Sequence, residues 1–120
     1  MAQKILVVDD EPEIVREVES ELRENHYETV SACNGKIGLE MAEREHPDLI
    51  LLDVKMPVMG GFETLWALKR TSGTSAIPVI MLSGIIGTSS ILEAQSLGAS
   101  DYIPKPFPLE DLVRFIKRHI

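Results

Sequence analysis

Short runs of consecutive apolar residues alternate along the chain with longer segments in which apolar residues recur every three or four positions. Three of the runs, at residues 5–8, 49–52 and 79–82, lack the alternation of apolar and polar residues that marks a strand with one face in water. They therefore predict strands that are covered on both faces. Weaker candidates at residues 28–32 and 101–103 bring the number of predicted strands to five.

The segments between these strands have the length and the periodicity of helices. Residues 12–25 place four apolar residues on one helical face: Ile14, Val15, Val18 and Leu22. Further helices are expected at residues 36–45, 61–70 and 88–97, and from Pro108 onward. Because strands and helices alternate, the pattern predicts an α/β fold built on one parallel sheet.

Length, charge and cysteine content narrow the class of protein. The 120 residues have the size of one domain, which we assign to residues 1–120. A net charge of −7 disfavours nucleic-acid binding, since phosphate contacts need a basic surface.

Cys33 is the only cysteine, so a disulfide within the chain is excluded, and we expect a small buried thiol. The apolar run near the amino terminus is too short for a signal peptide or a membrane span, so a reducing cytoplasm is the expected location.

The residue that follows each predicted strand is informative, because ligands of an open parallel sheet bind beyond the carboxyl ends of its strands. These positions carry three carboxylates, a hydroxyl and an ammonium: Asp9, Asp10, Asp53, Ser83 and Lys105. Neighbouring carboxylates repel one another unless a cation compensates, and oxygen ligands with room for phosphate favour Mg²⁺, with Mn²⁺ as a substitute. Each residue alone is explained as a helix cap, a turn former or a solvated amine. The whole set together favours a functional site.

Four stretches of the sequence carry a resemblance to a known family: ILVVDDEPEI, HPDLILLDVKMPVMGGFE, PVIMLSG and LGASDYIPKPF. In their order and spacing they resemble the receiver domains of two-component response regulators, and the resemblance covers essentially the whole chain. It implies a flavodoxin-like, doubly wound sheet of five parallel strands in the order 2-1-3-4-5, with five helices. It also implies a phosphoacceptor signalling switch and not an enzyme, since such a domain catalyses only its own phosphorylation and dephosphorylation.

The resemblance assigns roles to the residues at the strand ends. Asp53 would accept the phosphoryl group, and Ser83 and Lys105 would bind phosphoryl oxygens. Four groups would hold Mg²⁺: the carboxylates of Asp9, Asp10 and Asp53 and the backbone carbonyl of Lys55. These roles agree with the chemistry, because phosphoryl transfer depends mainly on positioning and on neutralising charge.

Further residues are expected to support the switch. Tyr102 would be the aromatic residue that turns inward on phosphorylation, although a half-buried tyrosine on an edge strand is the simpler alternative. The Lys105–Pro106 bond is expected to be cis, because the chain must turn sharply to aim the lysine into the pocket. Lys55 and Ile85 would flank the path of the water that hydrolyses the phosphoryl group.

Some residues receive only structural roles. Gly61 is expected to supply a flexible turn before its helix, and Leu65, Trp66 and Leu68 are expected to pack in the core. The three histidines have no ligand spacing and are expected near the surface: His26, His46 and His119.

The resemblance also implies partners. The donor would be a sensor histidine kinase or a phosphotransfer protein. The output domain or partner would contact the face formed by the fourth helix, the fifth strand and the fifth helix, and phosphorylation-dependent pairing of two copies is a further option. No contact with nucleic acid or membrane is expected.

Three other functions are alternatives to a phosphoacceptor switch. A hydrolase of the haloacid-dehalogenase type would form the same aspartyl phosphate, but it has a second aspartate two residues after the nucleophile, where this chain has Lys55. A flavin- or nucleotide-binding protein would need a glycine-rich loop after the first strand, where this chain has carboxylates. An interaction domain with an inactive acceptor site is disfavoured because every matched site position is occupied.

Overall fold

The computed structural model describes residues 2–84 and 88–120, in which five strands alternate with five helices. The strands are β1 (Lys4–Val8), β2 (Glu28–Ala32), β3 (Leu49–Asp53), β4 (Val79–Ser83) and β5 (Asp101–Pro104). The helices are α1 (Pro12–Glu24), α2 (Gly35–Glu45), α3 (Gly61–Arg70), α4 (Thr88–Ser96) and α5 (Leu109–Lys117). Each predicted element is confirmed, and each predicted bound lies within one residue of the observed one, except that the helix expected from Pro108 onward ends at Lys117, three residues before the last residue.

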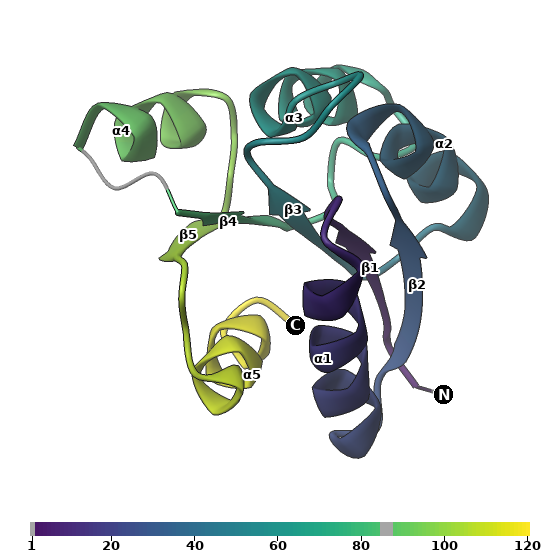
Figure 1. Ribbon diagram of the computed structural model, residues 1–120. Helices are drawn as coiled ribbons and strands as arrows, with labels where there is room; N and C mark the ends of the chain where they lie inside the picture. Colours follow the sequence, from purple (N-terminus) through teal and green to yellow (C-terminus); the bar gives the residue numbers. More distant parts are fainter. Residues whose placement is uncertain (1, 85–87) are drawn as a thin grey trace.

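All neighbouring strands pair in parallel, in the order β2-β1-β3-β4-β5. Helices α1 and α5 cover one face of the sheet, and α2, α3 and α4 cover the other (Figure 1). The architecture is therefore the doubly wound, flavodoxin-like α/β fold expected from the sequence. Strands β2 and β5 lie at the edges, which explains why their apolar patterns were weaker than those of the central strands.

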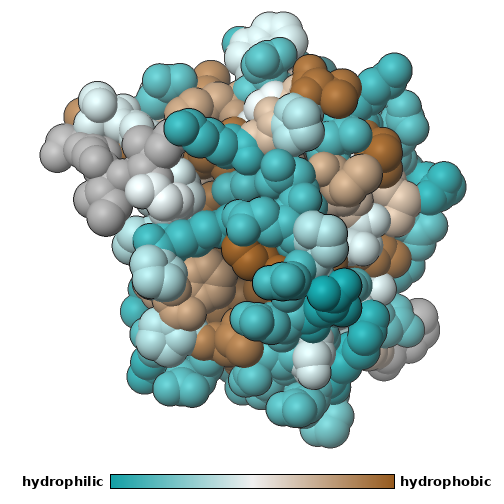
Figure 2. Space-filling view, in the orientation of Figure 1, coloured by the Kyte–Doolittle hydropathy of each residue, from teal (hydrophilic) through white to brown (hydrophobic). Residues whose placement is uncertain are grey.

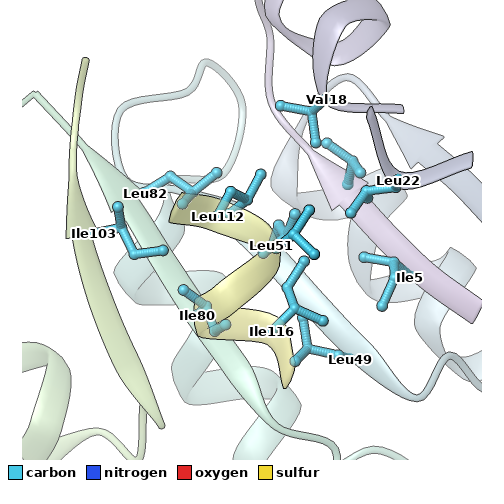
Figure 3. Packing of buried hydrophobic residues seen from close by; sticks show 12 residues of the cluster. Ile5, Val18, Leu22, Leu49, Leu51, Ile80, Leu82, Ile103, Leu112 and Ile116 are labelled. Atoms are coloured by element: carbon cyan, nitrogen blue, oxygen red, sulfur yellow. The ribbon is translucent and has the colours of Figure 1, made fainter. Parts of the chain in front are cut away.

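Two apolar cores hold the layers together, and each central strand contributes to both. In β1, Ile5 and Val7 belong to the core under α1 and α5, whereas Leu6 and Val8 belong to the core under α2, α3 and α4. Figure 3 shows side chains of α1, α5 and the strands pointing toward one another in the first core. Each fully buried leucine or isoleucine contributes about 1.5–3 kcal/mol relative to exposure, so these strands anchor the sheet.

Two predictions about individual side chains were wrong. Trp66 is 50% exposed, and the Arg70 guanidinium carbon lies 4.6 Å from its ring centroid. Leu65 and Leu68 are buried as expected, and Trp66 points away because adjacent helical residues differ in direction by about 100°. Cys33 is also exposed: it follows the edge strand β2 and lines a surface groove beside α1.

The histidines lie outside the acidic pocket. His26 and His46 are exposed and have positive φ angles of 70° and 48°, a conformation in which histidine is enriched. His119 is partly buried, and its Nε2 lies 3.2 Å from Asp101 Oδ2. Their expected position near the surface is thus confirmed for the first two.

Hydrophilic residues cover most of the face seen in Figure 2, and apolar residues reach the surface in separate patches. Within residues 2–84 and 88–120, the helices are too short and too polar to cross a membrane.

Candidate metal and phosphoryl site

The carboxyl ends of four parallel strands bring the candidate residues to one edge of the sheet. Asp9 follows β1, Asp53 and Ser83 end β3 and β4, and Lys105 follows β5. The side chains of Asp9, Asp53 and Ser83 are buried, with residue exposures of 2%, 5% and 1%. Polar groups buried at strand ends in this way need partners, and Lys105 is a partner of both Asp9 and Asp53.

Four carboxylates gather at this edge. One oxygen from each of them lies within 4.8 Å of the others: Asp9, Asp10, Glu11 and Asp53. Two of the four residues are buried and two are exposed, so the cluster has one side open to solvent. Oxygen ligands at this spacing fit a hard divalent cation such as Mg²⁺ that keeps part of its water shell.

Lys105 supplies the positive charge that the protein itself brings to the cluster. Its Nζ donates a hydrogen bond to Asp9 Oδ2 at 2.8 Å and lies 3.3 Å from Asp53 Oδ1. Burial alone would lower the pKa of Lys105, but its hydrogen bond to Asp9 and the charges of Asp53 and Asp9 outweigh burial and raise it. The lysine is therefore held in its charged form.

Asp53 carries the clearest electrostatic signature of the site. Burial raises the pKa of Asp53 to about 6, the charge of Asp9 adds to the effect, and Lys105 opposes it. The single ammonium therefore does not neutralise the carboxylates, and the pocket keeps a surplus of negative charge. This surplus is the observation that makes the residues fit a divalent cation.

A close approach of the backbone positions Asp53. The amide of Val54 donates to the Leu82 carbonyl at 3.2 Å, and the amide of Gly61 donates to the Val54 carbonyl at 2.8 Å. A Cβ on Gly61 would overlap with the Asp53 carbonyl oxygen. Lack of space, rather than the flexibility expected from the sequence, therefore explains a glycine at position 61.

The loop between Asp53 and α3 carries backbone strain. Val58 has a φ of 70° and is 78% exposed. The left-handed conformation crowds the Cβ of a branched residue and costs about 1–2 kcal/mol. Lys55, in the same loop, is exposed.

The residues expected to support a switch lie around the same edge. Lys105 donates its backbone amide to the Ser83 carbonyl at 2.7 Å, and the Lys105–Pro106 bond is cis, as expected. Tyr102 is half-buried and, with Ile91 and Ala94, lines a hollow between β5 and α4. Ile85 lies outside the described residues.

One residue of the site was missed in the sequence. The Oε1 of Glu11 lies 3.8 Å from Lys105 Nζ, and Glu11 belongs to the carboxylate cluster. Its position directly after two aspartates was the available signal, but the same position also suits an ordinary helix start.

Fold and site together define a class of protein. It is a doubly wound α/β domain with an acidic cluster at the carboxyl edge of its sheet, in which a buried carboxylate lies beside a lysine ammonium. The chain belongs to the response regulator receiver domain family, whose model matches residues 5–117. Such domains act in two-component signalling, and the chain is therefore a signalling domain of that kind.

Curated relatives support this assignment. The chain is 38% identical to a probable transcriptional regulator ycf27 of Porphyridium aerugineum and 39% identical to the response regulator PleD of Caulobacter vibrioides, with 98% of the chain matched in each case. It spans only 49% and 25% of the lengths of these two proteins. Protein PilG of Pseudomonas aeruginosa is 32% identical, and 87% of its length is matched.

Solved structures agree with the fold. The chemotaxis protein CheY4 of Vibrio cholerae superposes with a TM-score of 0.95 at 32% identity, and both chains are covered completely. The receiver domain of the sensor histidine kinase PA1611 of Pseudomonas aeruginosa has a TM-score of 0.90 at 28% identity, with 99% of this chain and 98% of that one covered. That structure holds a magnesium ion coordinated in its active site cleft.

Proposed function

We propose that this chain is a phosphoacceptor switch in which Asp53 takes a phosphoryl group from a phosphohistidine donor. The observation that carries the proposal is the placement of Asp53: it is buried at the end of β3, 3.3 Å from the ammonium of Lys105 and within the carboxylate cluster. A carboxylate in this position can act as a nucleophile. The ammonium of Lys105 beside it supplies positive charge for the oxygens of the incoming phosphoryl group.

Asp9, Asp10 and Asp53 would hold Mg²⁺ together with the backbone carbonyl of Lys55, and Mn²⁺ would serve as a substitute. The divalent ion supplies positive charge that offsets the repulsion between the carboxylates and an anionic donor. Two observations support this assignment: the surplus negative charge of the pocket and the oxygen-only ligand set.

In the proposed reaction, an Asp53 carboxylate oxygen forms a bond to phosphorus while the bond between phosphorus and the donor nitrogen breaks. The nitrogen leaves with the bonding electron pair, and the product is an acyl phosphate. Lys105 and the Ser83 hydroxyl then bind phosphoryl oxygens. The chain's own residues supply the nucleophile and the positioning, and no further substrate is turned over.

The signal would pass to a partner through α4, β5 and α5. Tyr102 supports this direction, because it lies in β5, three residues before Lys105, and lines a hollow with Ile91 and Ala94 of α4. The donor would be a sensor histidine kinase or a phosphotransfer protein. Residues 1–120 would form one receiver domain. We place the exchange in the cytoplasm, in keeping with the single cysteine of the chain.

Phosphoramidate and Mg²⁺ test the proposal directly. The intact mass should rise by one phosphoryl group, and the gain should vanish when EDTA is added or when Asp53→Asn replaces the parent chain. Phosphorylation of Asp53→Asn at the parental rate would show that the acceptor lies elsewhere.

A further inference from the structure

Glu11 stands at the start of α1 but does not cap it. Its backbone is extended, with φ −97° and ψ 104°, and its side chain makes no hydrogen bond to the helix. Its Oε1 instead lies 3.8 Å from Lys105 Nζ. The side chain is thus directed to the phosphoryl pocket although a residue in this place commonly bonds to the first helical amides.

Lys105 has as many carboxylate neighbours as it has N–H groups. An ammonium offers three donors, and its distances to Asp9, Asp53 and Glu11 are 2.8, 3.3 and 3.8 Å. The Asp9 and Asp53 side chains are 1% and 7% exposed, whereas the Glu11 side chain is 61% exposed. Glu11 therefore makes the longest and most hydrated of the three contacts, which is the one that costs least to break.

We infer that Glu11 is a positioning residue: its carboxylate forms a loose ion pair with the Lys105 ammonium until an incoming phosphoryl group displaces it. The inference rests on the proposed function of Asp53. A phosphoryl group on Asp53 brings new anionic oxygens to an ammonium that three carboxylates already surround, and the contact with Glu11 is the one that costs least to give up. Until it does, Glu11 adds negative charge at the open side of the pocket and weakens the binding of an anionic donor.

A simpler role for Glu11 is a favourable interaction with the positive end of the α1 dipole. Glu13 separates the two roles. It is also an exposed glutamate in the first turn of α1, but it forms no ion pair with Lys105, whose carboxylate partners among the described residues are Asp9, Glu11 and Asp53. Glu11→Gln and Glu13→Gln remove the same charge from the same helix end. A difference in donor binding between the two variants therefore results from the contact of Glu11 with Lys105.

The experiment measures the initial rate of phosphorylation against phosphoramidate concentration, in saturating Mg²⁺ and low salt. Glu11→Gln should lower the half-saturating donor concentration by about three- to tenfold, as expected for one charge a few ångströms from an anionic donor in a hydrated setting. Glu13→Gln should leave it within about 1.5-fold of the parent, since its charge is more distant and screened. The gain of Glu11→Gln should shrink toward unity in about 0.5 M KCl.

Glu11→Ser provides a second neutral variant that can itself cap the helix, and it should lower the half-saturating concentration like Glu11→Gln. Far-ultraviolet circular dichroism and thermal unfolding establish that each variant folds. Equal effects of Glu11→Gln and Glu13→Gln, or an effect that persists unchanged in high salt, overturn the role of Glu11. A parent chain that takes up no phosphoryl group overturns the proposed function itself.

Discussion

Gly61 lies against the backbone of Asp53 so closely that a Cβ atom at position 61 would overlap with the Asp53 carbonyl oxygen. Gly61→Ala should therefore push the acceptor strand and α3 apart and lower the free energy of unfolding by about 2 kcal/mol. Urea denaturation measures the change. Gly73→Ala is the matched control, because no heavy atom lies within 4 Å of the added Cβ. Its effect should stay within about 1 kcal/mol, and equal losses for both variants would show that the close approach is unimportant.

Asp53 should destabilise the metal-free protein at neutral pH. Its folded pKa of about 6 lies above the ordinary value of 3.8, so protonation favours the folded state and stability rises as pH falls from about 7 to 4. Asp53→Asn has no charge to bury and should be more stable than the parent by about 2–3 kcal/mol at pH 7.5 in EDTA.

Paired urea titrations at several pH values check this expectation. The advantage of Asp53→Asn should disappear near pH 4, and saturating Mg²⁺ should reduce it at pH 7.5 because the cation offsets the carboxylate charge. An advantage that is the same at every pH would instead indicate a packing effect of the amide.

Cys33 should report on the charge of the acidic cluster. It is exposed and lines the same surface groove as Asp9 and Asp10. A dianionic disulfide reagent such as DTNB should react faster when Mg²⁺ is added, by roughly twofold, because the cation offsets the repulsion between the reagent and the carboxylates. Absorbance at the thiolate band follows the reaction.

A neutral disulfide, 4,4′-dithiodipyridine, is the matched control, and its rate should not change. Equal acceleration of both reagents would mean that Mg²⁺ alters the exposure of Cys33 rather than the local potential.

The phosphorylated form should be long-lived for a receiver domain. Lys55 is exposed in the loop after the acceptor, and Ile85 stands two positions after Ser83 in the sequence. Neither residue offers a side-chain carboxylate or amide that could orient an attacking water. The transition state of hydrolysis is therefore not stabilised, and the barrier stays high. The double variant Lys55→Asn/Ile85→Glu should lose its phosphoryl group faster, by roughly tenfold or 1.4 kcal/mol. Intact mass against time measures the loss, and an unchanged or slower loss would show that Lys55 and Ile85 do not prolong the lifetime of the phosphoryl group.

The sequence was sufficient for the fold because its strongest signals are local. The runs at β1, β3 and β4 are apolar on both faces, and only a sheet with helices on both sides buries them. Parallel strands then bring their carboxyl ends to one edge, so Asp9, Asp53 and Lys105 had to meet.

The direction of individual side chains and the contact between Glu11 and Lys105 could not be predicted from the sequence. Helix α3 carries apolar residues in several directions, and only the packed structure shows that Trp66 faces solvent while Leu65 does not. Glu11 could not be separated from an ordinary helix start, because the lysine that it approaches follows the last strand. Cys33 was misplaced because a lone apolar thiol has no periodicity to indicate its face.

The ion pair between Asp9 and Lys105 joins residues 96 positions apart and connects the ends of the first and last strands, which are not neighbours in the sheet. A chain emerging from the ribosome therefore exposes its aspartates long before their counter-charge is synthesised. Until β5 adds to β4, Asp53 lacks the ammonium that would bind phosphoryl oxygens under the proposed function. A phosphoryl donor would then find a competent acceptor only after β5 has joined the sheet, and copies truncated before Lys105 would be poor acceptors.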